Sequence, residues 1–335
     1  MAAQPKPTRP IGVLLFNLGG PEDQAAVEPF LINLFSDRDI IELPLGAVLQ
    51  PVFARLIAKL RGPSVRRNYA LIGGGSPQLR FTRAQAAALE ARLNHGDGGF
   101  KTAIAMRYWH PDTEEALRNL ADADVERIVT LTLYPQYSRA TTGSSERALT
   151  RVLERPEWKG RFSVSGIRSY ADHPLYLDAL AGTVRRGLAG FDVSGRDRVV
   201  LLFSAHGLPQ RFVDAGDPYV DETRVTLRGV LERLDVPNRH VLGFQSRSGP
   251  VRWTGPGTDQ QIDRLGRDGM REVLVVPLSF VSDHIETLYE VDILFKRRAL
   301  EAGITDFRRV TALGTDPLFI EALARLVESH LEQRT

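Results

Sequence analysis

The 335-residue chain contains no cysteine. Disulfide bonds, thiolate metal sites and cysteine-ligated iron–sulfur clusters are therefore all excluded. No stretch approaches the ~20 apolar residues that a membrane-spanning helix needs. The proline-rich residues 1–10 also lack the apolar core of a secretory signal. These absences lead us to expect a cytoplasmic protein.

The charge balance shows no excess of one sign. The 43 basic and 41 acidic residues give a formal net charge of +2. A protein that coats nucleic acid needs a concentrated basic face, so we expect no nucleic-acid partner. With 43% hydrophobic and 25% charged residues, the chain is globular and long enough for two cores.

One segment, residues 43–61, is apolar and ends in cations. Such a stretch can rest on a bilayer surface as a peripheral contact or form the lip of an apolar ligand pocket. A plain packed helix is the alternative.

Strand-like apolar runs alternate with amphipathic helical patterns along the whole chain. This alternation is typical of βαβ units and a parallel sheet. The predicted strands are residues 11–17, 100–108, 127–133, 162–167, 198–205, 240–245 and 272–278.

The two halves of the chain also resemble each other. Residues 14–21 parallel residues 201–209 with one insertion, and residues 128–138 match residues 273–283 without a gap. We therefore predict an α/β protein with two similar doubly wound, Rossmann-like domains, whose parallel sheets face a central cleft. Chance similarity between strand–turn–helix junctions is the alternative. The predicted domains are residues 8–165 plus 312–335, and residues 166–311.

Two of the predicted strands end in side chains that bind protons or metals. One leads to His206, and another leads to Asp283, Glu286 and Glu290. Ligands of open α/β sheets bind at the carboxyl ends of the strands. We expect Asp283 to cap a helix on which Glu286 and Glu290, one turn apart, share a face. This set fits a divalent metal or a proton relay, although caps and surface groups would look the same.

Eight motifs in a fixed order give the chain a more specific likeness. They are FNLGGP at 16–21, DRD at 37–39, IGGGSP at 72–77, MRYWHP at 106–111, YPQYS at 134–138, FSAHGLP at 203–209, GPVRW at 249–253 and SDHIETLYE at 282–290. Together they resemble the ferrochelatases, enzymes with a chelatase-like fold that insert ferrous iron into protoporphyrin IX to give protohaem. The resemblance covers nearly the whole chain and implies protoporphyrin IX and Fe(II) as substrates.

The resemblance also implies residue roles. His206 and Glu286 would face each other across the macrocycle, contact the metal and accept pyrrole protons. Asp283, His284 and Glu290 would form an outer relay. The porphyrin-binding candidates are Lys59, Arg61 and Ser76 for the propionates, and Arg107, Tyr108, Tyr134 and Trp253 for the ring.

The chain departs from some members of the family. In ferrochelatases with a [2Fe–2S] cluster, a cysteine follows the YPQYS motif, and here that position is Arg139. We expect no iron–sulfur cluster, no cofactor beyond the substrate iron, and a monomer whose closing helix, residues 317–331, packs on the first domain.

Three other functions remain open from the sequence. A chelatase of the same fold would act on another metal, or on coproporphyrin. A non-catalytic haem or metal carrier would need the cleft but not the acidic residues opposite His206.

Overall fold

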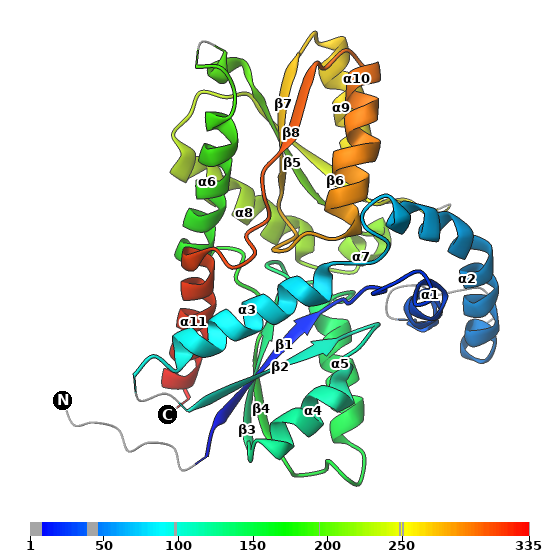
Figure 1. Cartoon of the computed structure of the whole chain (residues 1–335), viewed down its shortest axis with the longest axis vertical. Coiled ribbons are helices and arrows are strands. Elements are labelled where there is room, and N and C mark those ends of the chain that lie inside the picture. The colour runs from blue at the N-terminus through cyan, green and yellow to red at the C-terminus, as the bar shows by residue number, and fades with distance from the viewer. Residues whose placement is uncertain are drawn as a thin grey trace. The chain divides into compact units, whose positions relative to one another are not determined.

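The fold is described from a computed structural model of the chain, in which residues 9–38, 46–96, 99–193, 195–247, 249 and 251–334 are described. The chain forms two compact units (Figure 1). The first comprises Met1–Ser169 with Gly314–Thr335, and the second comprises Tyr170–Leu313.

The first unit is built on a parallel four-stranded sheet with the order β2-β1-β3-β4. Its strands are β1 (Ile11–Asn17), β2 (Phe100–Met106), β3 (Arg127–Thr132) and β4 (Ser163–Ile167). The central strands β1 and β3 are apolar and almost wholly buried. Burial on both faces explains why these strands are continuous apolar runs.

The helices of this unit are α1 (Val27–Ser36), α2 (Gly46–Ala70), α3 (Gln78–Leu93), α4 (Thr113–Asp122), α5 (Thr142–Leu153) and α11 (Pro317–Glu332). Helices α3, α4, α5 and α11 pack on the sheet, whereas α1 and α2 pack mainly against each other. One core lies between the sheet and the pair α4 and α5, with Leu117, Leu120 and Leu149 buried in it. The closing helix α11 lies beside α3 (Figure 1), and the ion pairs of Arg92 with Glu321 and Glu328 join these two helices.

The second unit repeats the arrangement with the order β6-β5-β7-β8. Its strands are β5 (Val200–His206), β6 (His240–Gln245), β7 (Glu272–Pro277) and β8 (Asp306–Arg309), all parallel. Its helical elements are α6 (Pro174–Ala189), η1 (Arg196–Arg198), α7 (Gln210–Asp214), α8 (Tyr219–Leu234), α9 (Thr258–Arg267), the π-helix η2 (Glu286–Phe295) and α10 (Lys296–Glu301). The core on one face of this sheet joins β5 and β7 to α9, η2 and α10.

The predicted α/β class, with two similar domains that each contain a parallel sheet, is confirmed, including the internal repeat. Strand β1 holds the same place in its sheet as β5, and β3 the same place as β7. The predicted strands match the observed ones to within about two residues, the scale on which strand ends are uncertain. Strand β8 was not predicted, because Asp306–Arg309 is short and charged and lies at the sheet edge.

Helix α2 contains the described part of the amphiphilic segment 43–61, and residues 43–45 lie outside the described residues. None of the helices in the described part of the chain combines the length and the apolar character needed to cross a bilayer.

Candidate active site

The centre of the site is a contact between His206 and Glu286. His206 is the last residue of β5, and Glu286 is the first residue of η2, which follows β7 in the chain. Strands β5 and β7 are neighbours in a parallel sheet, so their carboxyl ends bring the two residues to the same edge. Nδ1 of His206 lies 2.7 Å from Oε2 of Glu286. The expectation that these two residues face each other across the macrocycle is therefore wrong, because a planar ring has no room between side chains in direct contact. The His206 side chain keeps 38% of its surface exposed, so the ring is reachable from outside the pair.

The two groups shift each other's protonation. Burial alone would lower the pKa of His206, but the Glu286 carboxylate outweighs it, and the pKa is raised above 6.5. Burial would raise the pKa of Glu286, but the imidazoles of His206 and His284 hold it below 4.5. The pair therefore favours a carboxylate beside an imidazole that binds a proton readily.

A third residue, Ser246, connects Glu286 to Glu290. Its hydroxyl lies 2.6 Å from Glu286 Oε2 and 2.5 Å from Glu290 Oε2, and its backbone N–H donates to Glu290 Oε1 at 2.8 Å. Gln245 donates to the backbone carbonyl of Glu286 at 3.0 Å. Burial and the charge of Glu286 raise the pKa of Glu290. The two glutamates therefore do share a face, held together by one hydroxyl.

Sequence reasoning missed Ser246, although a signal was present. Ser246 follows β6 directly, so it stands at the same strand-end edge as His206. Its backbone has φ = 62°, a left-handed conformation that is uncommon for a residue with a side chain. Such strain often accompanies a functional site, and here it aims a hydroxyl at two carboxylates.

His284 lies beside the pair and is buried. Its Nε2 is 3.8 Å from Oε1 of Glu286, and the rings of His284 and Phe280 are in edge contact at 4.4 Å. Its Nδ1 is buried and has no hydrogen-bond partner among the described residues. Burial lowers the pKa of His284, so this ring is neutral at neutral pH.

Asp283 does not cap the helix, so that prediction is wrong. The helix starts at Glu286 with Ile285 at its N-cap and no side-chain cap. Asp283 Oδ1 instead accepts hydrogen bonds from Thr287 Oγ1 and Arg309 Nη1, both at 2.9 Å. Arg309 also pairs with Asp292 at 2.8 Å. Asp283 is thus tied to β8 through Arg309. Sequence reasoning did not predict this pairing.

Trp253 lies against the loop that follows His206. It pairs with Pro209 in an isolated antiparallel bridge, and Thr254 exchanges hydrogen bonds with the backbone of Leu208. Gly207 has no room for a side chain, because a Cβ there would lie 2.7 Å from the Gln245 carbonyl oxygen and 3.4 Å from the Trp253 ring. The loop therefore holds the indole close to the strand end that carries His206.

In the first unit, Arg107 and Tyr108 converge on a buried acid, Asp37. Oδ2 of Asp37 accepts from Arg107 Nη2 at 2.7 Å, from Tyr108 Oη at 2.6 Å and from Ser144 Oγ at 2.7 Å. Burial raises the pKa of Tyr108 well above 10, so its hydroxyl stays a donor. The hydroxyl of Tyr134 is also buried, and it has no hydrogen-bond partner among the described residues.

The remaining candidates lie on α2 and on the turn that precedes α3. Lys59 and Arg61 are exposed on α2, and the Arg61 guanidinium lies over the Phe35 ring at 5.7 Å. Ser76 is half-buried, and its hydroxyl accepts from the backbone N–H of Gln78 at 3.3 Å. His206, His284, Glu286 and Glu290 form one cluster in the second unit. The other candidates on β2, α2 and the adjoining turns belong to the first unit.

The family follows from comparison with known proteins. The family model described as Ferrochelatase matches residues 10–331. The chain belongs to the ferrochelatase family. A ferrochelatase of Geotalea uraniireducens is 52% identical over 94% of this chain and 96% of its own length. A ferrochelatase of Synechocystis sp. is 47% identical over 96% of this chain and 82% of its own length. The resemblance drawn from the eight motifs is confirmed, and with it the enzyme class, a metal chelatase.

Two solved structures share the fold. SirB from Bacillus subtilis with Fe3+ has a TM-score of 0.57 at 10% identity and covers 96% of this chain and 95% of its own. DR2241 from Deinococcus radiodurans, a multi-domain protein described as structurally similar to chelatases, has a TM-score of 0.52 at 14% identity, covering 95% of this chain and 54% of its own. At this low identity, both comparisons support the fold alone.

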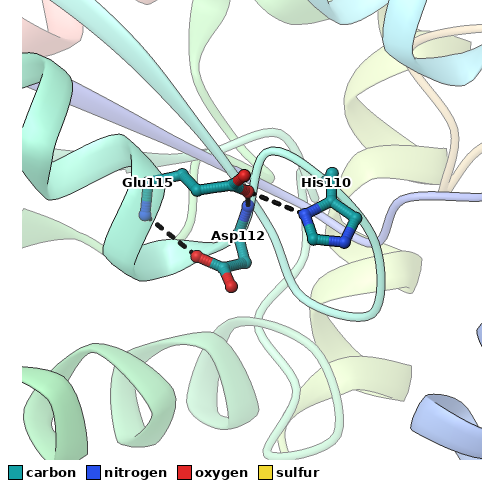
Figure 2. Close-up of side chains that lie close together, drawn as sticks. All are labelled: His110, Asp112 and Glu115. Atoms are coloured by element: carbon teal, nitrogen blue, oxygen red, sulfur yellow. Dashed lines mark hydrogen bonds and ion pairs between the residues drawn. The ribbon is translucent and has the colours of Figure 1, made fainter.

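A second group of ligand-type side chains lies in the first unit of this ferrochelatase-family chain (Figure 2). Ligand atoms of His110, Asp112 and Glu115 lie within 4.8 Å of one another. Asp112 caps α4 by accepting from the N–H groups of Glu114 and Glu115, while the Glu115 carboxylate returns to the Asp112 N–H in a capping box. His110 Nδ1 bonds Glu115 at 2.8 Å. Helix capping therefore accounts for both carboxylates, because they satisfy N–H groups that would otherwise lack partners.

A pocket of about 320 Å³ in the second unit adjoins Ser246 and Glu290. Arg247, paired with Asp259, and the neighbouring Arg297 line it as well. Glu290, the acid of the pair that does not contact His206, thus borders a polar pocket of the same unit.

Proposed function

We propose that the chain inserts Fe(II) into protoporphyrin IX and releases protohaem and two protons, with His206 and Glu286 acting at the metal. The observation that carries this assignment is the 2.7 Å contact between the two side chains, built from separate strand ends at the edge where α/β folds bind ligands. The family's reaction, insertion of iron into a porphyrin, sets the chemistry that these groups must perform.

The proton balance explains why an imidazole is needed. The free-base porphyrin carries two pyrrole N–H groups, and both N–H bonds break as four nitrogen–metal contacts form around a dication. The contact of Nδ1 with Glu286 orients the ring and leaves Nε2 for a pyrrole proton or for the entering metal. The Glu286 charge makes the ring a better proton acceptor, because the resulting imidazolium is paired at once.

The onward route for protons runs along the carboxylates. Ser246 touches both Glu286 and Glu290, and Glu290 borders the polar pocket. We assign Glu290 and His284 as relay residues around Glu286. Asp283 supports this relay through its pairing with Arg309 and its bond to Thr287.

We assign the other candidates to the porphyrin. Lys59 and Arg61 are exposed cations suited to the propionates, with Ser76 as a hydroxyl partner. Arg107 and Tyr108 are already bonded to Asp37, so they suit a rigid wall for the ring better than a salt bridge to it. Tyr134 and Trp253 supply apolar faces for the macrocycle.

The amphiphilic segment supports a peripheral membrane contact. Val52, Leu56 and Leu60 on α2 are 58%, 52% and 71% exposed, at the spacing that places them on one side of a helix. Arg55 and Lys59 lie among them and match the negative charge of anionic lipid headgroups. We propose that this stripe rests on the bilayer surface and that the enzyme works in the cytoplasm.

Vesicle sedimentation tests the membrane contact. The protein is expected to sediment with vesicles containing anionic phospholipid, and the triple substitution of Val52, Leu56 and Leu60 by Ser should abolish this. Leu318→Ser, which changes an exposed leucine on α11, serves as the control. Equal sedimentation of the triple variant and the control would remove the stripe from the proposal.

We further propose that the protein is a monomer. We also propose that it holds no iron–sulfur cluster, since the chain has no cysteine to ligate one. Light scattering and iron analysis of the purified protein test the two statements.

The decisive experiment follows metalation of protoporphyrin by absorbance with Fe(II) or Zn(II). We expect His206→Ala to bind porphyrin but not metalate it, and Glu286→Gln to lose most of the rate. A carrier would bind porphyrin and leave its free-base spectrum intact. Adding coproporphyrin in competition with protoporphyrin, and Co(II) in competition with Fe(II), tests whether the chain is instead a chelatase for one of these substrates. Normal turnover by His206→Ala would overturn the assignment.

A further inference from the structure

The backbone of His206 lies beyond the end of its neighbouring strand. The last ladder bond between β5 and β7 runs from Leu278 N–H to the Ser204 carbonyl, and β7 ends at Pro277. Alternate residues of a strand bond to opposite neighbours. His206 therefore directs its N–H and C=O toward β7, where no strand remains, while Gly207 bonds to β6 through the Gln245 carbonyl.

Two buried side chains take the place of the missing strand. The His206 N–H donates to Ser279 Oγ at 3.2 Å, and Tyr219 Oη donates to the His206 carbonyl at 3.0 Å. The hydroxyls of Tyr219 and Ser279 lie 2.6 Å apart. Without them, the N–H and C=O groups of His206 would lack hydrogen-bond partners on this side of the strand, which is unfavourable for buried backbone groups.

The three contacts close into a ring with one consistent direction. Tyr219 uses its single proton on the His206 carbonyl, so Ser279 must donate to Tyr219 Oη, and Ser279 in turn accepts from the His206 N–H. Burial raises the pKa of Tyr219, which keeps its hydroxyl protonated for this task. Each donor and each acceptor is used once within the ring.

We propose that Tyr219 and Ser279 are positioning residues that hold His206 at the distance from Glu286 required for metal insertion. Tyr219 opens helix α8, and Ser279 lies on the loop that joins β7 to η2. The ring therefore ties the backbone of His206 to the same loop that delivers Glu286. Neither hydroxyl contacts the imidazole, so both act on the reaction through the backbone.

This inference rests on the assigned role of His206, and its first test separates the chemical step from substrate binding. Tyr219→Phe removes the hydroxyl and keeps the ring, as Ser279→Ala does for the serine. Each is expected to lower kcat for Zn(II) insertion about tenfold, because the loss of a group that orients a metal-binding histidine typically lowers activity on this scale. The KM for porphyrin should stay nearly unchanged. Ser279→Thr, which keeps a hydroxyl, should retain most of the rate.

The closed ring also predicts how the two substitutions combine. Opening it at one point frees the His206 backbone, so the double variant should be hardly slower than either single variant. Rate losses that multiply in the double variant would show two independent contributions and overturn the ring.

Tyr176→Phe is the matched control. Tyr176 is also buried in the second unit, and its hydroxyl donates to a backbone carbonyl, that of Leu278, at 3.2 Å. It should lose a similar amount of stability and keep wild-type kcat. Equal kcat losses in Tyr176→Phe and Tyr219→Phe would reduce the proposal to a general effect on folding.

Zn(II) affinity of the porphyrin-free protein gives a readout without turnover. We expect the affinity to fall about tenfold in Tyr219→Phe and not in Tyr176→Phe. If the wild type fails to metalate porphyrin, the proposed function fails, yet this titration still tests the ring. Unchanged affinity together with unchanged kcat in Tyr219→Phe would overturn the positioning role.

Discussion

The hydroxyl of Ser246 lies 2.5 Å from a carboxylate oxygen of Glu290 and, on its other side, 2.6 Å from Glu286. A serine hydroxyl has one proton and cannot donate to both acids. A second proton is therefore needed for both contacts to be hydrogen bonds, and Glu290 is the favoured holder, because burial and the charge of Glu286 raise its pKa. Protons can then pass between the acids through the hydroxyl.

Removal of this hydroxyl should slow metal insertion. We expect Ser246→Ala to lose about tenfold in kcat, equivalent to about 1.4 kcal/mol in the barrier. Ser246→Gly is the informative control, because glycine adopts φ = 62° without strain and also lacks the hydroxyl. Similar loss in both variants assigns the effect to the hydroxyl, whereas a normal rate in Ser246→Gly would assign it to backbone strain.

Glu290→Gln should gain stability and lose activity. The pKa of Glu290 in the folded state lies above the usual 4.5. Its contribution to stability is therefore full below pH 4.5 and is lost as the pH rises through the folded-state pKa. Gln imitates the protonated acid and avoids the loss, which predicts a higher free energy of unfolding at pH 7 than that of the wild type. Urea titrations at pH 4 and pH 7 measure it. A variant that is less stable at pH 7 and inserts metal normally would contradict both halves.

The sequence predicted the parts of this site that depend on strand ends and missed those that depend on distant partners. His206 and Glu286 could be found because each follows an apolar run whose carboxyl end must lie at the sheet edge. The same rule applied to β6 would have found Ser246. The pairing of Arg309 with Asp283 could not be found, since no local pattern links a residue on β8 to one before η2.

The shape of the helix after Asp283 was also beyond sequence reasoning. An α-helix and a π-helix differ by one residue in the reach of each backbone hydrogen bond, and their compositions overlap. The motif residues therefore predicted a helix and a shared face for Glu286 and Glu290. They did not predict that the helix begins at Glu286.

Metal binding to the porphyrin-free enzyme should release a proton. The Glu286 carboxylate raises the pKa of His206, so below that pKa an entering cation must displace a proton from the ring. Affinity for Zn(II) should rise with pH and level off above the raised pKa. Glu286→Gln removes the charge and should shift this rise to lower pH. Calorimetry in two buffers of different ionisation enthalpy counts the protons, and an affinity that is independent of pH from 5 to 8 would contradict the assignment of His206 as a ligand.

Arg309→Met should loosen η2. The guanidinium is only 9% exposed and pairs with both Asp283 and Asp292, so its loss leaves Asp283 without its cation. We expect a loss of about 3 kcal/mol in the free energy of unfolding and faster hydrogen exchange in η2. Asp292→Asn, at a more exposed partner, should cost less than about 1 kcal/mol. Equal costs for the two variants would show that Arg309 serves only its surface pair.

Asp37→Ala should destabilise the first unit more than most single substitutions. It removes one carboxylate that accepts from Arg107, Tyr108 and Ser144, and it leaves the largely buried Arg107 charge unpaired. The expected loss is about 3–5 kcal/mol, read as a lower urea midpoint with an unchanged slope. The double variant Asp37→Leu with Arg107→Met replaces both charges by apolar groups and should recover part of the loss. If the double variant is the less stable of the two, the cost lies in packing around Asp37 and not in the unpaired guanidinium.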